Sequence, residues 1–201
     1  MFKRQIVSIN IKKMHQHFKL HKPNLYLSQF IYEKKRNKKL LGSLFPFPEG
    51  TMAIGRLDED SEGLLFLTTD GMMSEIVRDK KVEKEYFAQV DGIITQEAID
   101  ALQIGVEIGF KGTKYITKPC TANFLHNIPT CIGAGHKIRD ERHGPTSWLR
   151  ITLTEGKFRQ VRKMTAKVGF PTLRLIRYRI GNETIEDLNS GEVKEVISFN
   201  L

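Results

Sequence analysis

Four acidic side chains crowd five positions of a basic chain: Asp58, Glu59, Asp60 and Glu62. Three interpretations fit this turn. It can be a solvated connection between strands, where Asp and Glu are common. It can bind Mg²⁺ through Asp58 and Asp60 in a nuclease, provided that further carboxylates converge there. It can also present one aspartate as a nucleophile or electrostatic catalyst, held by an arginine. Taken alone, the turn leaves all three open.

A second stretch, residues 154–170, combines lysines and arginines with the spacing of a helix. Its apolar positions fall on one face and are expected to pack on a sheet: Val161, Met164 and Val168. Arg159 and Lys163 lie opposite, whereas Arg162 lies at the border between the two faces. An arginine at that border can reach into a half-buried pocket. The pattern indicates either a basic solvent face or the cationic wall of a binding site.

Other short elements must position these two stretches. We expect strands at 25–32, 51–56, 64–68, 82–90, 106–108, 114–125, 148–154, 172–180 and 192–199. We expect helices at 71–78, capped by Asp70, at 96–102, capped by Thr95, and at 158–168. Because several strands follow one another directly, the order favours an α+β fold around a largely antiparallel, mixed sheet with flanking helices.

The strand expected at 172–180 carries three arginines. Arg177 and Arg179 alternate along one face, and Arg174 lies on the other. Beside a basic helix, such a row predicts a track for a nucleic-acid backbone.

Composition favours a phosphate-bearing partner. The chain has 201 residues, with 32 Lys and Arg against 23 Asp and Glu, a net charge of +9 and a pI of about 9.5. Cys120 and Cys131 form no CxxC pair, so we expect a reducing, cytoplasmic location. No apolar run approaches the roughly 20 residues that cross a bilayer, so no membrane partner is expected. Residues 1–20 are interpreted as a basic N-terminal arm and 21–201 as one domain of two packed halves.

Three ordered motifs are more specific. They are GRLD at 55–58 with the following DSEGLLFLTTDG, KEYFAQV at 84–90, and EGKFRQVRKM at 155–164. They resemble the three motifs of the pseudouridine synthases that modify ribosomal RNA, and HKPNLYLSQF at 21–30 resembles the opening strand of that family. The run 146–181 is most similar to one branch, the E-type synthases of large-subunit ribosomal RNA. The resemblance extends from about residue 20 to residue 181.

The resemblance implies a role for each matching residue. Asp58 would be the catalytic aspartate, and Arg162 would pair with it and keep it ionised. Tyr86 would stack on the flipped uracil, and Arg56 would fill the space that the uridine leaves in the RNA helix. Further substrate contacts are expected from Lys84, Lys157, Arg159, Gln160 and Lys163. Basic residues of the long irregular stretch 126–147 would contact RNA phosphates: Lys137, Arg139 and Arg142.

The family also implies a fold with a central catalytic cleft and an activity. The implied reaction is isomerisation of a specific uridine in bacterial large-subunit (23S) ribosomal RNA by a monomer. It involves neither redox chemistry nor phosphoryl transfer, so no cofactor and no metal are expected. Asp58 could attack C1′, assist formation of a glycal, or add to the base. Residues 1–20 are too few for the S4-type RNA-binding module of the sister branch, so no S4 domain is expected.

Two rival functions remain at this stage. One is a non-catalytic, ribosomal-RNA-binding assembly factor on the same fold, which would not need Asp58, Tyr86 and Arg162 together. The other is the Mg²⁺-dependent nuclease that the acidic turn allows.

Overall fold

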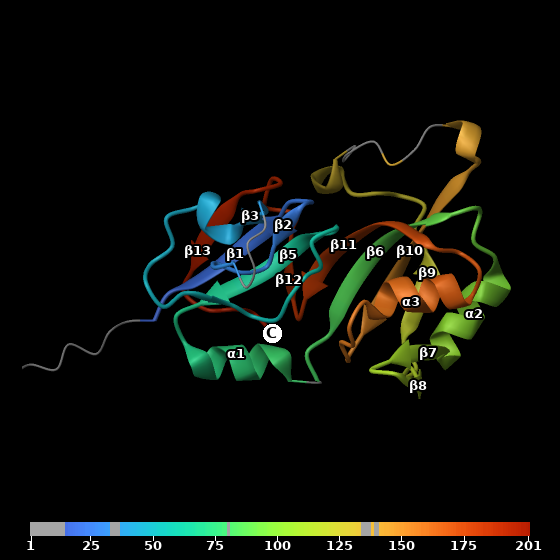
Figure 1. Cartoon of the computed structure of the whole chain (residues 1–201), viewed down its shortest axis with the longest axis horizontal. Helices are drawn as coiled ribbons and strands as arrows, with labels where there is room; N and C mark the ends of the chain where they lie inside the picture. Colours follow the sequence, from blue (N-terminus) through green and yellow to red (C-terminus); the bar gives the residue numbers. More distant parts are fainter. Residues whose placement is uncertain (1–14, 33–36, 80, 134–137, 139–140) are drawn as a thin grey trace, which may run out of the picture.

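The computed structural model describes residues 15–32, 37–79, 81–133, 138 and 141–201. Its main feature is a nine-stranded sheet whose path runs β13-β1-β5-β11-β6-β10-β9 (Figure 1). In chain order these strands are β1 (His17–Lys22), β5 (Ser61–Thr68), β6 (Lys84–Asp91), β9 (Thr121–Phe124), β10 (Thr146–Leu153), β11 (Thr172–Ile180) and β13 (Val193–Val196). Along this path, β5 and β11 are parallel and the other neighbours are antiparallel.

Short strands complete the sheets. On the main sheet, β4 (Met52–Ala53) pairs with β5, and β12 (Glu183–Thr184) pairs with β11. Two small sheets stand apart: β2 (Tyr26–Leu27) with β3 (Lys39–Leu40), and β7 (Glu107–Phe110) with β8 (Thr113–Ile116). The predicted α+β fold with a largely antiparallel, mixed sheet is confirmed.

Three α-helices and three 3-10 turns accompany the described strands. They are α1 (Gly71–Arg78), α2 (Gln96–Ile104), α3 (Gln160–Lys167), η1 (Leu41–Ser43), η2 (Thr130–Ile132) and η3 (Glu141–His143). Asp70 caps α1 by accepting from the backbone N–H of Met72 at 2.9 Å, and Thr95 caps α2 by accepting from that of Ala98 at 3.3 Å, as predicted. In Figure 1, α1 lies under the half that contains β1 and β5, whereas α2 and α3 cover the half that contains β6 and β10. No helix among the described residues is long and apolar enough to cross a membrane.

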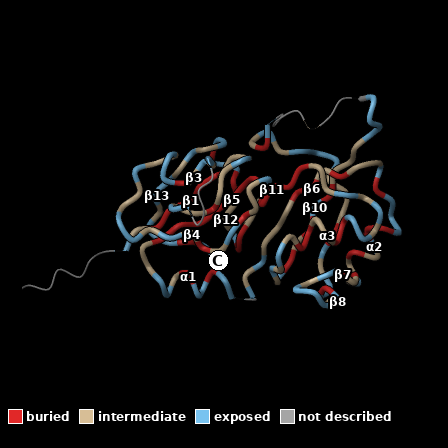
Figure 2. The backbone as a smooth tube through the Cα atoms, in the orientation of Figure 1, coloured by how far each residue is buried: buried red, intermediate tan, exposed pale blue. Residues whose placement is uncertain are grey.

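Strand β5 is buried on both faces. Leu64 and Phe66 pack in one apolar cluster, together with Val77 of α1, whereas Leu65 and Leu67 pack in another on the opposite side. A strand that is covered on both faces needs apolar side chains at consecutive positions, which explains the sequence LLFL at residues 64–67. The buried strands form the central band of Figure 2.

The other half has its own core, formed where α2 and α3 pack on β6 and β10. Val161 and Met164 of α3 are buried in it, and Val168 packs against it. The predicted apolar face of this helix is therefore confirmed.

The first strand corrects the predicted boundary of the N-terminal arm. Residues 17–20, assigned to the arm, lie in β1, and every residue of β1 is buried. The prediction failed because four of the six side chains of this strand are polar. Lys19 pairs with Glu183 at 2.8 Å and Asp187 at 3.0 Å, and His17 bonds Thr68 at 2.9 Å. Residues 1–14 lie outside the described part of the chain.

Several predicted elements are shorter than expected, among them the strands at 51–56 and 192–199, which are reduced to Met52–Ala53 and Val193–Val196. The strand at 25–32 is reduced to Tyr26–Leu27, and Leu25 directly before it adopts a positive φ of 65°. The strand at 114–125 is two strands, separated around Pro119. The helix at 158–168 begins only at Gln160, because Arg159 takes a left-handed conformation with φ 52°.

Gly63 allows β5 and β11 to approach closely. It has φ +108° and faces Arg177 in the parallel pair. A Cβ atom at this position would lie 2.3 Å from the backbone oxygen of Arg177. Only glycine fits both the conformation and the space.

Gly63→Ala is expected to lower the free energy of unfolding by about 2–4 kcal/mol, because the added methyl group must displace β11 and the backbone conformation disfavours alanine. The matched control is Gly50→Ala, where φ is +85° but nothing lies within 4 Å of the added carbon. The control should lose only about 1–2 kcal/mol from conformational strain. Urea unfolding at unchanged m-value measures both. Equal losses in the two variants would contradict the close approach.

Candidate active site

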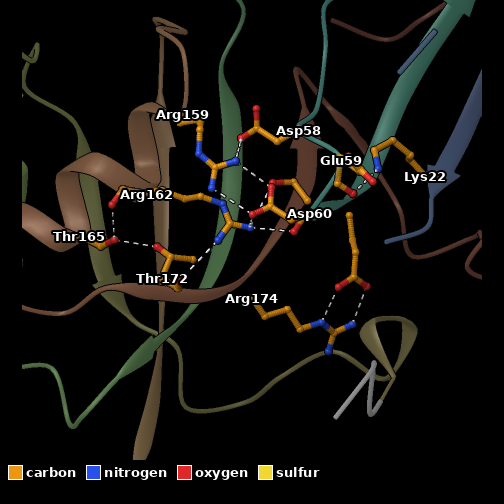
Figure 3. Close-up of polar contacts among 11 residues, drawn as sticks. Lys22, Asp58, Glu59, Asp60, Arg159, Arg162, Thr165, Thr172 and Arg174 are labelled. Atoms are coloured by element: carbon orange, nitrogen blue, oxygen red, sulfur yellow. Dashed lines mark hydrogen bonds and ion pairs between the residues drawn. The ribbon is translucent and has the colours of Figure 1, made fainter. Parts of the chain in front are cut away.

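The acidic turn lies against α3 because β5 and β11 are neighbours. Ser61 begins β5 and pairs with Leu175 of β11, and α3 precedes β11 directly in the chain. The parallel register therefore brings residues 58–62 to the N-terminal end of α3. Figure 3 shows the side chains of Arg159 and Arg162 pointing toward this turn.

Arg159 binds two carboxylates of the turn. Its Nη1 and Nη2 donate to the two carboxylate oxygens of Asp60 at 2.9 and 3.0 Å, a bidentate contact. Its Nη1 also lies 3.3 Å from Oδ2 of Asp58. Arg159 was predicted as an RNA contact, and its left-handed backbone gave no signal in the sequence. In the structure it is the arginine paired with Asp58.

Arg162 holds the backbone of the turn, so the predicted pairing of Arg162 with Asp58 is wrong. Its Nη2 donates to the backbone oxygen of Asp60 at 2.8 Å and lies 3.3 Å from Oδ2 of the same residue. Its Nη1 donates to the backbone oxygen of Thr172 at 3.2 Å. Because these contacts engage the guanidinium, Arg162 acts on Asp58 only from a distance, whereas Arg159 contacts it.

The two neighbouring aspartates have pKa values shifted in opposite directions. Burial raises the pKa of the Asp58 carboxyl, and repulsion from Asp60 adds to this; Arg159, Arg162 and Lys22 oppose the rise without reversing it. Hydrogen bonds from Arg159 lower the pKa of Asp60. Paired carboxyl groups with separated pKa values are typical of catalytic sites.

The remaining acids of the turn have their own cations. Arg174 binds Glu62 in a buried bidentate pair, with distances of 2.8 and 2.9 Å, and Lys38 binds Glu59 at 2.7 Å. By contrast, the nearest cation to Asp58 is Arg159, at 3.3 Å, and Arg159 also binds Asp60 at the shorter distance of 2.9 Å. The side chain of Asp58 is 24% exposed. The side chains of Glu59 and Asp60 are more exposed, at 29% and 48%, so Asp58 is distinguished by its weak pairing and not by its exposure.

Asp58 opens into a pocket of about 260 Å³. Tyr86 of β6 lines the same pocket, as do Arg56 before the turn and Lys157 and Phe158 before α3. The structure therefore gathers the predicted Asp58, Tyr86, Arg56 and Lys157 around one space. Phe158 was not predicted as a site residue. Its side chain is 68% exposed, which is unusual for phenylalanine and could not be foreseen from the motif.

Gln160 supports the loop before α3. It is only 4% exposed, although it lines the pocket. Its Oε1 accepts from the backbone N–H of Lys157 at 2.9 Å, and its Nε2 donates to Glu155 at 2.6 Å. Glu155 also accepts from Tyr115 and from the backbone N–H of Lys118. Sequence reasoning missed Glu155, whose carboxylate fixes this wall of the pocket.

Other predicted site residues lie elsewhere. Lys84 lines a neighbouring pocket, and Lys163 donates to the backbone oxygen of Gly109 at 2.8 Å. Arg142 is exposed in η3. Lys137 and Arg139 lie outside the described residues.

The three arginines of β11 do not form the exposed row that was predicted as a track for a nucleic-acid backbone. Arg174 and Arg177 are buried, and Arg174 is occupied by Glu62. Arg179 is paired with Glu83 and Glu85. Because β11 lies in the middle of the sheet, alternation along this strand does not place its side chains on a surface.

The carboxylates of the acidic turn are poorly suited to bind a metal cation, because arginines already neutralise two of them. Asp60 and Glu62 are each held by an arginine, so their oxygens already have positive partners. Among the described residues, no group of three or more His, Cys, Asp or Glu side chains is placed to hold a metal ion. The geometry favours an aspartate held by arginines over the Mg²⁺ interpretation.

Residues 16–167 match the family model for RNA pseudouridylate synthase. The chain belongs to this family. It is 41% identical over 177 residues to the ribosomal large subunit pseudouridine synthase E of Vibrio vulnificus (strain CMCP6), covering 87% of this chain and 72% of the relative. The protein of the same name from Xanthomonas axonopodis pv. citri (strain 306) is 39% identical over 171 residues, 84% of this chain and 87% of the relative.

A solved structure described as a pseudouridylate synthase has the same fold. It superposes with a TM-score of 0.71 at 26% identity, over 90% of this chain and 70% of that chain. The resemblance read from the three motifs is confirmed, and this RNA pseudouridylate synthase is an isomerase.

Arg159→Gln should raise the pKa of Asp58 further, because Arg159 is the nearest of the cations that oppose the effect of burial. The readout is a pH titration of the Asp58 carboxyl carbon by NMR. Lys167→Gln, an exposed change in the last turn of the same helix, serves as the control and should leave that pKa in place. A lower or unchanged pKa in Arg159→Gln would contradict the assigned ion pair.

Proposed function

We propose that this protein converts a specific uridine of bacterial large-subunit (23S) ribosomal RNA to pseudouridine, with Asp58 as the essential catalytic group. The observation that carries this proposal is the shared pocket: a half-buried aspartate, the aromatic face of Tyr86 and three cations line one space. The relatives named above are synthases of the large ribosomal subunit, which supports this choice of RNA.

The reaction begins with extrusion of the target nucleotide. A base within a folded RNA cannot reach a pocket, and flipping it out costs a few kcal/mol. Arg56 is exposed at the pocket wall and is placed to fill the space that the uridine leaves. Tyr86 offers a stacking face to the flipped uracil, and such stacking contributes roughly 1–3 kcal/mol per base.

The chemistry exchanges one bond for another. The bond from C1′ to N1 breaks, the uracil turns, and a bond from C1′ to C5 forms; the proton leaves C5 and N1 gains one. Asp58 acts as a carboxylate, through attack on C1′, support of a glycal, or addition to the base. Because its pKa is raised, activity should fall on acidification at a higher pH than an ordinary aspartate would give.

The positive residues around the pocket provide RNA affinity. Arg56 and Lys157 line the pocket, and the net charge of +9 attracts a polyanion over longer distances. The proposal includes the cytoplasm as the location, a monomer as the active form, and a reaction without cofactor or metal.

Asp58→Asn should abolish isomerisation, with a loss of at least about a thousandfold, and leave RNA binding largely intact, because the amide keeps the shape but not the charge. Asp70→Asn is the matched control, since asparagine caps a helix as well as aspartate does. The measurement is pseudouridine mapping of ribosomal RNA from cells that lack this gene and carry either variant. Modification by Asp58→Asn would overturn the assignment, and an unmodified map in wild-type cells would favour the assembly factor.

Chelation gives a second test. Isomerisation by the purified protein should persist with EDTA present, and the RNA should keep its length on a denaturing gel. Cleavage of the RNA that requires Mg²⁺ would instead support the nuclease.

A further inference from the structure

A second pocket of about 310 Å³ lies beside the catalytic pocket. The two share part of their lining, including Arg56, Tyr86 and Lys157. The second pocket extends away from Asp58, between the start of β6, the end of α1 and the middle of β11. Any group bound there would be a close neighbour of the flipped base.

The second pocket carries a strong excess of positive charge. Five basic residues line it: Arg56, Arg78, Lys84, Lys157 and Arg177. The one acid among its lining residues is Glu155, whose carboxylate is engaged by Tyr115, Gln160 and the backbone of Lys118. The pocket is therefore suited to an anion.

Arg177 contributes a buried donor that no group in the described part of the chain satisfies. The residue is 5% exposed, and its Nε donates to the backbone oxygen of Leu64 at 2.7 Å. Its Nη2 is buried and has no hydrogen-bond partner among the described residues. Buried donors of this kind are rare because they lose water without replacement, so this one points to a ligand.

Lys84 is held close to this arginine. Its Nζ donates to the backbone oxygens of Val82 at 2.6 Å and Asp79 at 3.3 Å. Burial, with repulsion from Arg177, lowers the pKa of Lys84 to about 8. The charge of Asp79 opposes this lowering without reversing it, and an anion bound between Lys84 and Arg177 would offset the remaining repulsion.

We propose that this second pocket binds a phosphodiester group of the RNA next to the flipped uridine, with Lys84 and Arg177 as its principal ligands. The inference rests on the proposed function, since it takes the anion from the RNA backbone. A guanidinium matches phosphate oxygens in a planar, two-pronged geometry. By holding the backbone on one side of Tyr86, the pocket fixes which nucleotide stands over Asp58.

Inorganic phosphate is the first probe. In protein with isotopically labelled lysine, the pKa of Lys84 is followed by NMR in phosphate and in chloride at equal ionic strength. Phosphate should raise this pKa, because a nearby anion favours the charged amine. Identical titrations in the two salts would overturn the proposal. Asp58→Asn should respond to phosphate like the wild type, so this result is independent of the catalytic assignment.

RNA binding is the second probe, with the ribosomal RNA fragment that carries the mapped uridine. Lys84→Met should reduce the slope of log K against log salt by about 0.7–0.9, the value for one lost phosphate contact. Lys84→Arg should restore the slope. Lys194→Met, which removes one charge from β13 at the far edge of the sheet, should leave it unchanged.

The variants separate the possible failures. An unchanged slope in Lys84→Met, in protein that still isomerises uridine, would overturn the phosphate pocket and leave the enzyme assignment intact. Lys84 carries this test because it is only half-buried, whereas replacement of the buried Arg177 threatens the fold itself.

Discussion

The ion pairs of the acidic turn with Arg159, Arg162 and Arg174 are the interactions on which the candidate active pocket depends. Without Arg159, Arg162 and Arg174, the crowded carboxylates would repel one another and the turn would open. Such pairs contribute little net stability when intact, yet loss of one partner from a buried pair costs about 3–5 kcal/mol. Their main effect is therefore positional: they hold the turn so that Asp58 faces the pocket.

One strand register controls both pockets. The parallel pairing of β5 with β11 sets Ser61 opposite Leu175, beside the acidic turn, and Gly63 opposite Arg177, at the wall of the cationic pocket. A slip of one residue would turn every side chain of the strand to the wrong face. The same strand pairing thus places the acidic turn beside one pocket and the cluster of basic residues around the other, and Tyr86 lines both pockets.

Local patterns predicted the parts of the fold that local chemistry determines. The caps at Asp70 and Thr95, the apolar face of α3 and the buried run of β5 follow from spacing and residue type. The failures have long-range causes. The polar strand β1 is buried because Lys19 finds carboxylates more than 160 residues away.

The exchange of Arg162 for Arg159 as the partner of Asp58 has a similar origin. Arg159 has a positive φ, and the periodicity of the sequence does not predict such a backbone conformation at a non-glycine residue. The motifs identified several of the residues that gather at the site, but not which of them are in contact.

The contacts of the acidic turn also have a consequence for biosynthesis. Asp60 and Glu62 are separated from Arg159 and Arg174 by 99 and 112 positions along the chain. Contacts between residues so far apart in the sequence form slowly, because a long loop of chain must first be ordered. While the chain is being translated, the turn leaves the ribosome long before its counter-charges exist. The candidate site therefore cannot form until Arg174 has been synthesised, when most of the chain is already present.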